Sequence, residues 1–325
     1  MVKKNSNILK ILILAALIII IPTLIPNMYI MQIINMICIY IILGTSINVL
    51  TGFTGQLSLG QAAFFGIGAY ATAILNTRAG MQFLPCMIGS VLLTALFGVI
   101  LAVPALKVKG SYLALLTMGF GEVVRIVMIN WTPVTNGTAG ILGIEAPELF
   151  GFSFDTLGKY YFLIMVFVIL GLVYQNIILK TRTGRAFVAI REDNEAAELT
   201  GINVTAYKIK AFVLSAVYCG VAGCLYAMMI KYVSPDTFTN NVSSVILWTA
   251  IVGGFGTVIG PVLGGIVMQV LPEALRFLGD WRLVVYGVIL LIVILRFPGG
   301  LYPYIHKFLE AYKEKKAVRN AAEKG

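Results

Sequence analysis

Residues 28–50 read MYIMQIINMICIYIILGTSINVL and contain no charged side chain. A helix of about 20 apolar residues is long enough to cross the hydrocarbon core of a bilayer. Residues 51–68 follow directly and read TGFTGQLSLGQAAFFGIG, so glycines and polar side chains interrupt the apolar sequence. The first segment predicts a membrane-spanning helix. The second predicts a neighbouring span that is broken or re-entrant, which is tolerated only where protein or a watery cavity surrounds the backbone.

Similar apolar runs make up the rest of the chain. Hydrophobic residues account for 59% of its 325 residues and charged residues for 12%, about half the charged fraction of a soluble domain. We therefore expect an all-α, polytopic membrane protein with about ten transmembrane helices, and the spans that flank Gly260 are also expected to be broken or re-entrant. The predicted spans lie near residues 8–25, 28–50, 57–76, 84–103, 111–130, 159–179, 207–230, 242–257, 260–277 and 282–297.

The N-terminal run has the basic start and apolar middle of a secretory signal peptide. It lacks a cleavage site of the small-x-small kind, and Pro22 and Pro26 end it just before the second predicted span. We therefore expect a retained first span.

The basic residues predict the orientation of the chain. Most of the 24 lysines and arginines fall on one side of the membrane when both termini are placed in the cytoplasm, and such an excess marks the cytoplasmic side. We expect a transmembrane domain at residues 1–303 and a basic cytoplasmic tail at 304–325. The longest inner loop is then 180–205, and the longest outer loop is 131–158, which either docks an extracytoplasmic partner or is an ordinary surface loop.

Several functions are excluded by what the chain lacks. The net charge of +10 comes from bases between apolar runs, so it does not form the basic stripe that binds nucleic acid. The single histidine, His306, has no cysteine or carboxylate cluster beside it, and the cysteines lie inside apolar stretches. No metal site, disulfide or catalytic residue is expected from these patterns.

The inner loop contains a predicted docking helix. Residues 184–199 read GRAFVAIREDNEAAEL and predict a short helix that Gly201 ends. Phe187 and Ile190 fall on one side at helical spacing while the charged residues fall elsewhere. Such a helix is suited to a groove in another protein, and the alternative is a helix lying on the membrane or on the chain's own core. The candidate docking residues are Arg191, Glu195, Ala196, Ala197, Glu198 and Gly201.

Polar side chains inside the predicted spans are candidates for a translocation route. Gln56, Ser58 and Gln61 are unfavourable in hydrocarbon unless they face a cavity or another helix. Lining a route and packing between helices are both consistent with them. Glu122 and Arg125 are three residues apart, as a helical ion pair would be. That pair either meets a zwitterionic substrate or is a structural ion pair near the outer end of its span.

Three glycines recur at a spacing of four. Gly256, Gly260 and Gly264 would share one face of a helix and allow another helix to approach closely. We expect helix packing rather than a flexible gate.

Five short motifs along residues 30–300 together resemble the permeases of ATP-binding-cassette importers. Within that class they are most similar to the branched-chain amino acid permease family, and to its M-type subunit in particular. The motifs are Thr51-Gly52-Phe53-Thr54-Gly55-Gln56-Leu57-Ser58-Leu59-Gly60-Gln61-Ala62, Gly121-Glu122-Val123-Val124-Arg125, Asn136-Gly137, Glu195-Ala196-Ala197-Glu198-Leu199-Thr200-Gly201 and Gly253-Gly254-Phe255-Gly256-Thr257.

The resemblance implies a permease in the cytoplasmic membrane of a prokaryote that imports leucine, isoleucine and valine. It implies three kinds of partner besides membrane lipid: a second permease subunit, two ATPase subunits and an extracytoplasmic solute-binding protein. No P-loop string occurs in this chain, so ATP and Mg are expected on the partner subunits and no cofactor on this one. Urea or a short-chain amide is an alternative substrate for the same fold. An ion-coupled secondary transporter would need more buried carboxylates than the lone Glu122.

Overall fold

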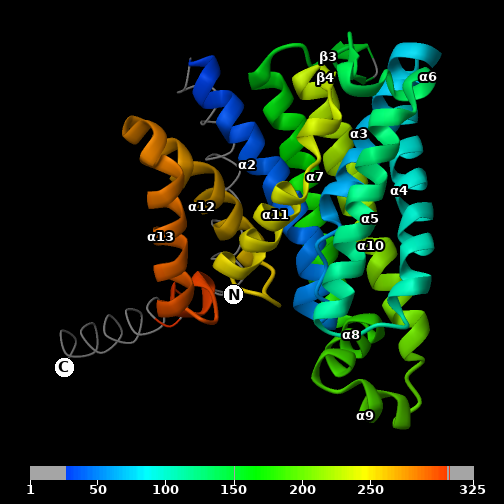
Figure 1. The fold of residues 1–325 in the computed structure, drawn as a ribbon, viewed down its shortest axis with the longest axis vertical. Coiled ribbons are helices and arrows are strands. Elements are labelled where there is room, and N and C mark those ends of the chain that lie inside the picture. Colours follow the sequence, from blue (N-terminus) through cyan, green and yellow to red (C-terminus); the bar gives the residue numbers. More distant parts are fainter. Residues whose placement is uncertain (1–26, 150, 306, 308–325) are drawn as a thin grey trace, which may run out of the picture.

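The computed structural model describes residues 27–149, 151–305 and 307. These residues form a bundle of helices that run along one common direction, as Figure 1 shows. The two small sheets lie in connections at one end of the bundle. The predicted first span at 8–25, the position of both termini and nearly all of the tail at 304–325 lie outside the described residues.

Each predicted span after the first coincides with a helix or a helix pair. Within the described residues, six helical segments are long and apolar enough to cross a membrane, which fits the predicted polytopic fold. They are α2 (Met28–Ile47) with its continuation η1 (Asn48–Phe53), α4 (Phe83–Ala105), α5 (Ser111–Asn130), α7 (Leu157–Lys180), α10 (Val204–Ile230), and α13 (Arg282–Arg296) with the preceding η4 (Arg276–Trp281).

Helix α3 (Gln61–Ala79) is long enough to cross but less apolar than these six. It contains Gln61, Thr72 and Asn76, and all three side chains are buried. It packs against α4 and α10. A polar helix of this kind is stable at membrane depth because other helices, rather than lipid, surround it.

Helices α11 (Asn240–Gly253) and α12 (Gly260–Ala274) have 14 and 15 residues. At 1.5 Å per residue each is only about 21–23 Å long, shorter than a hydrocarbon core of about 30 Å. Residues 254–259, which contain no helix, join them beside Asn48, the first residue of η1. The prediction of broken or re-entrant helices around Gly260 agrees with this pair.

Helix α10 is the centre of the bundle and packs against α2, α3 and α4. Its buried face is made largely of small residues such as Ala216, Cys219 and Ala222, each with no exposed surface. Small side chains let neighbouring backbones approach closely, which is how helices associate in a membrane.

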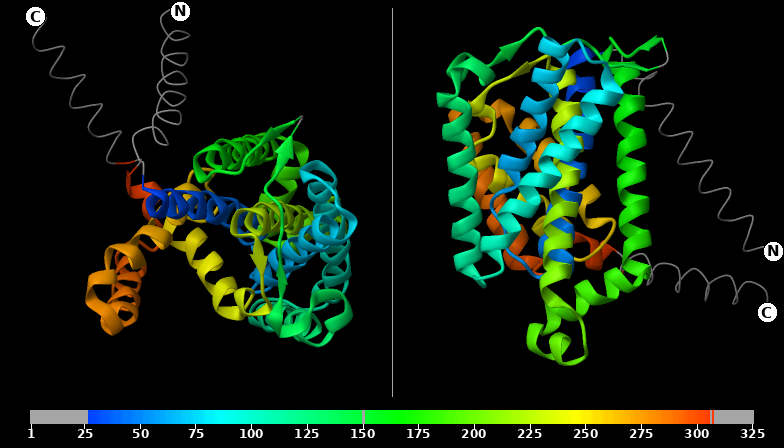
Figure 2. Two further views of the ribbon diagram at one scale, coloured as in Figure 1. Left: turned by 90° about the horizontal axis from the view of Figure 1, so that it is seen from above. Right: turned by 90° about the vertical axis from the view of Figure 1, so that its right-hand side faces the viewer.

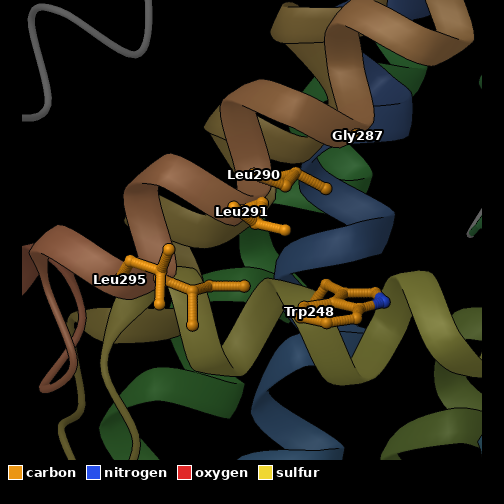
Figure 3. Close-up of a pocket in the computed structure, with 6 residues that line it drawn as sticks. Trp248, Gly287, Leu290, Leu291 and Leu295 are labelled. Atoms are coloured by element: carbon orange, nitrogen blue, oxygen red, sulfur yellow. The ribbon is translucent and has the colours of Figure 1, made fainter.

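Helices α12 and α13 stand to one side of this core when the bundle is viewed from above (Figure 2). Helix α13 packs on α11, α12 and η4. It leaves an apolar groove against α11 (Figure 3). The groove is lined by Trp248, Gly287, Leu290, Leu291, Ile294 and Leu295. None of these residues is charged, so the groove suits lipid or an apolar helix and not an amino acid's charged groups.

The two longest connections lie at opposite ends of the bundle (Figure 1). One, between α5 and α7, contains α6 (Thr132–Thr135), η2 (Gly137–Ala139), β1 (Ile141–Leu142), β2 (Glu148–Leu149) and β3 (Phe152–Ser153). The other contains α8 (Arg182–Glu192) and α9 (Asn194–Leu199). We call these the α6 end and the α9 end.

The connection at the α6 end is tied down by strand pairing. Strand β1 pairs antiparallel with β4 (Tyr232–Val233), which follows α10 and precedes η3 (Pro235–Thr237). Strands β2 and β3 pair with each other. The amide of Glu145 also donates to Asn76 Oδ1 at 2.8 Å, so the loop is bound to the end of α3.

Candidate functional site

The predicted docking helix is two helices and not one. Asp193 has extended backbone (φ −157°, ψ 118°) and separates α8 from α9. Its carboxylate accepts the amides of Glu195 and Ala196 at 2.8 and 3.1 Å. The prediction of a continuous helix over 184–199 is therefore wrong, because Asp193 is more favourable as the N-cap of a new helix than inside a continuous one.

The faces of α8 and α9 separate the candidate docking residues. Phe187, Ile190 and Ala197 are buried against the chain's own helices, whereas Glu195, Ala196 and Glu198 are exposed. Gly201 follows α9 with a φ of +83°, and its amide donates to the Glu198 carbonyl at 2.9 Å. Glycine adopts that left-handed conformation without strain, which is why the helix ends there.

Sequence reasoning missed Leu199. Its side chain is 90% exposed at the tip of the α9 end. An apolar residue that close to two glutamates, in a loop, was the available signal. Exposed apolar side chains surrounded by charged ones are typical of protein–protein contacts.

Arg191 points away from this tip and into the bundle. Its Nη1 donates to the carbonyl of Gly52 in η1 at 3.0 Å. Its Nη2 and Nε bind Glu192 Oε1 at 2.7 and 3.2 Å. The structure thus separates Arg191 from Glu195 and Glu198, with which the sequence had grouped it.

Residues 55–60 form the predicted irregular segment, since no helix covers them. Gln56 and Ser58 are buried there. Gln56 Nε2 donates to Thr54 Oγ1 at 3.1 Å, and Ser58 Oγ accepts the amide of Gly60 at 3.3 Å. Both side chains therefore hold the shape of the break.

Gln61 opens α3 and has no exposed surface. Its Oε1 accepts from Ser46 and Ser215 hydroxyls at 3.1 and 3.2 Å and from the Cys219 thiol at 3.0 Å. Side chains from α2, α3 and α10 thus meet in one polar cluster. Gln61 Oε1 thus joins three helices, while the buried Nε2 has no partner among the described residues, so route lining and helix packing both stay predictions for Gln61.

Glu122 and Arg125 form the expected ion pair, with 3.0 Å between Arg125 Nε and Glu122 Oε1. Two residues from elsewhere join them. Asn240 Nδ2, at the start of α11, donates to Glu122 Oε2 at 3.3 Å, and Asp236 Oδ1 of η3 lies 3.8 Å from Arg125 Nη1. The side chains of Glu122 and Arg125 are 39% and 25% exposed. This cluster, which we call the α5 ion cluster, joins α5 to the α11 side of the bundle.

The three glycines at a spacing of four do not share one helix. Gly256 lies in the break between α11 and α12 with a φ of +75°, so the prediction that places it on a helical face is wrong. Gly264 does face α11, whereas Gly260 faces the break that joins the two helices. A Cβ on Gly264 would lie 1.7 Å from the Thr249 carbonyl oxygen, and one on Gly260 would lie 2.3 Å from that of Gly254.

Among the described residues, no group of three or more His, Cys, Asp or Glu side chains is arranged to hold a metal ion. The cysteines Cys38, Cys86, Cys219 and Cys224 are all buried and unpaired.

Helix breaks at membrane depth, buried polar side chains and an all-helical apolar bundle define the class of polytopic membrane transport proteins. Residues 29–294 match the family described as branched-chain amino acid transport system, permease component. The chain belongs to this family. No solved structure matches the chain.

Comparison with individual relatives shows which members of the family this chain resembles. The high-affinity branched-chain amino acid transport system permease protein LivM of Salmonella typhimurium is 35% identical over 83% of this chain and 69% of its own length. LivM of Escherichia coli is 34% identical over 88% of this chain and 71% of its own length. The fructose import permease protein FrcC of Rhizobium meliloti is 30% identical, but over only 40% of this chain and 39% of its own. The similarity to the amino-acid permeases is thus far more extensive than the similarity to the sugar permease.

Proposed function

We propose that this chain is the membrane-spanning permease subunit of an ATP-driven importer of branched-chain amino acids. The observation that carries the proposal is the extent of its similarity to the LivM permeases, which covers more than four fifths of the chain. The geometry supports it, because the bundle has helix breaks within it and an exposed two-helix loop at one end. The chain itself carries out no chemical reaction in this proposal.

ATP and Mg are held by two separate ATPase subunits at the α9 end, which is the cytoplasmic face in this proposal. Leu199, Glu195 and Glu198 form an apolar centre with an acidic rim, a surface suited to a groove in another protein. Both termini of the chain then lie in the cytoplasm.

A second, similar permease subunit completes the membrane assembly. Helix α5 has large apolar side chains that are well exposed in this chain, among them Tyr112, Leu115 and Val123. Ionisable groups on the same helix, Glu122 and Arg125, are too costly to leave facing lipid. A second subunit would cover the apolar side chains of α5, and a water-filled route between the two subunits would keep Glu122 and Arg125 away from lipid. An extracytoplasmic solute-binding protein delivers substrate at the α6 end.

Glu122 and Arg125 contact substrate on this route. Leucine, isoleucine and valine are zwitterions, and a carboxylate beside a guanidinium presents both complementary charges. Gln56, Ser58 and Gln61 do not contact substrate in this proposal. They hold the broken segment and the start of α3 in place. The permease needs only modest affinity for substrate, because tight binding to one state slows release to the other side.

The test begins with purification of the intact complex from native membranes. Recovery of two ATPases and a second permease, with ATP-dependent uptake of leucine, isoleucine or valine in proteoliposomes supplied with the binding protein, supports the proposal. Uptake of urea in place of these amino acids would reassign the substrate. Isolation as a lone transporter driven by an ion gradient would overturn the proposal.

The docking face is tested by Glu195→Lys, which reverses a charge at the α9 tip. We expect the ATPases to be lost on purification and uptake to fall at least about tenfold, as for a central interface residue. Glu145→Lys is the matched control, because it makes the same charge change on an exposed residue at the α6 end. Equal retention of the ATPases in both variants would show that α9 is not the docking site.

A further inference from the structure

The last turn of α8 lies where the two irregular segments of the membrane domain meet. One segment is η1 with the non-helical residues 55–60, and the other is the break at 254–259. They are separated by about two hundred residues of sequence. Two side chains, Asn48 and Arg191, nevertheless contact backbone of both segments near the α9 end.

Asn48 joins the two irregular segments directly. It is fully buried in η1. Its Oδ1 accepts the amide of Gly256 at 2.8 Å, and its Nδ2 donates to the carbonyl of Thr257 at 2.8 Å. Both ends of the Asn48 amide are therefore used on the α11–α12 break, and a movement of either segment moves the other.

Arg191 adds the cytoplasmic loop to this junction. Its guanidinium donates to the Gly52 carbonyl at 3.0 Å. A Cβ on Gly256 would lie 2.9 Å from Arg191 Nη1, and a Cβ on Gly55 would lie 3.0 Å from Arg191 Cγ. The side chain of Arg191 is 37% exposed, and its other side lies against backbone of both irregular segments, where two glycines with positive φ leave space for it.

This arrangement differs from an ordinary surface contact. Hydrogen bonds between a charged donor and a carbonyl are stronger than those between neutral groups. A helix break has fewer internal backbone hydrogen bonds than a regular helix, and π-bulges are sites where helices bend and are frequent at functional sites. In the described part of the chain, Arg191 is the ionisable side chain of α8 that donates to a carbonyl of the membrane-spanning bundle beyond the adjacent α7. The Glu192 carboxylate holds the other edge of its guanidinium.

We propose that Arg191 is the positioning residue that transmits movement of the α8–α9 loop to the two helix breaks. When the loop is displaced, Arg191 pulls on the Gly52 carbonyl, and the Asn48 bridge moves residues 254–259 with it. Both breaks then rearrange together rather than one at a time. This inference rests on the proposed function, because it assumes ATPase subunits that displace the loop.

The experiment compares the reconstituted complex carrying Arg191→Gln, Arg191→Lys or no substitution in this chain. Two rates are measured in the same vesicles: ATP hydrolysis and leucine uptake. For Arg191→Gln we expect ATP hydrolysis to remain within about twofold of wild type while leucine moved per ATP falls about tenfold, since one charge-assisted bond is lost. Arg191→Lys keeps a charged donor and should recover part of that ratio. A merely structural role would lower both rates together.

Arg185→Gln is the matched control, because Arg185 lies on the same helix and its guanidinium binds only the carbonyl of Lys180, at 3.3 Å, in the described contacts. Its ratio of uptake to hydrolysis should equal that of wild type. An unchanged ratio for Arg191→Gln overturns the inference while leaving the proposed function intact. Failure of the wild-type complex to transport leucine overturns the proposed function instead.

A second variant tests whether Asn48 and Arg191 act in one linkage. Asn48→Ala should reduce the ratio as Arg191→Gln does, and the double variant should be no worse than the more affected single one, because both act in one linkage. Losses that multiply in the double variant would show that the two side chains act independently, and this result would also overturn the inference.

Discussion

At the scale of single residues, the roles of Glu122 and Arg125 depend on what covers α5. Within this chain their side chains are partly exposed, and Asn240 and Asp236 complete the α5 ion cluster. Lipid cannot be the cover, because a partly exposed charge at membrane depth is costly. We therefore expect water or a partner subunit to lie against them, and these two environments predict different outcomes when the charges are removed.

The double variant Glu122→Gln/Arg125→Gln removes both charges and keeps hydrogen-bonding groups of similar size. We expect the complex to assemble normally while leucine uptake falls at least about tenfold, because charge-assisted bonds to a zwitterion are lost. Purification followed by proteoliposome uptake measures both. Normal uptake would rule out contact with substrate, and lost assembly would assign the pair to the subunit interface.

Asp155→Asn/Lys159→Gln is the control pair. Lys159 Nζ lies 3.0 Å from Asp155 Oδ1 at the α6 end. This hydrogen bond lowers the pKa of Asp155, so the carboxylate is charged at neutral pH. Exposed surface pairs contribute little to stability, so we expect no change in assembly, and this pair is the control for the assembly measurement.

The hydrogen-bond partners of Gln61 could not be predicted from the sequence. A buried glutamine in a membrane span needs hydrogen-bond partners, but a watery route and a neighbouring helix supply them equally well. Its actual partners, Ser46, Ser215 and Cys219, come from distant parts of the chain.

At the scale of elements, apolar runs predicted the helices well. The span expected at 111–130 is α5 with the same bounds. Whether a segment of this length forms a membrane-spanning helix depends on its local composition, which can be read directly from the sequence. Where a helix breaks depends instead on contacts with residues that are distant in the sequence. Gly256 continues the four-residue spacing of Gly260 and Gly264, yet hydrogen bonding to Asn48 holds it in a non-helical backbone.

The α11–α12 pair depends on the absence of a side chain at Gly264. Gly264→Val would place atoms 1.7 Å from the Thr249 carbonyl oxygen. The helices must separate, and we expect a loss of at least about 1–3 kcal/mol in stability, the usual cost of overpacking. Thermal unfolding in detergent measures it.

Gly119→Ala is the control for that variant, because Gly119 is helical and a Cβ there would meet no atom within 4 Å. We expect it to be neutral or stabilising by up to about 1 kcal/mol, the helix-propensity gain of alanine over glycine. An equal loss in both variants would show that α11 and α12 do not depend on close approach.

At the scale of the whole molecule, the two long connections lie at opposite ends of the bundle, so their accessibility can test which end faces the cytoplasm. Leu199 at the α9 end and Leu142 at the α6 end are 90% and 71% exposed. A maleimide that cannot cross membranes should label Leu142→Cys in intact cells, and it should label Leu199→Cys only after the membrane is opened. The native cysteines are buried and give little background.

Labelling of both positions from outside would contradict the proposed orientation. Labelling of Leu199→Cys alone in intact cells would reverse it, and would place the α9 end, together with the proposed ATPase contact, outside the cytoplasm. Either result leaves the helical bundle itself unchanged.

The buried position of α3 also has a consequence for how the protein is made. Helix α3 is less apolar than the six spanning segments, and its buried faces are covered by α4 and α10. The ribosome synthesises α10 only after α4, α5 and α7, so α3 emerges long before its central neighbour exists. Biogenesis must therefore keep α3 away from bulk lipid until late in translation, and a defect in α10 would first become visible as failed membrane integration of a helix far upstream.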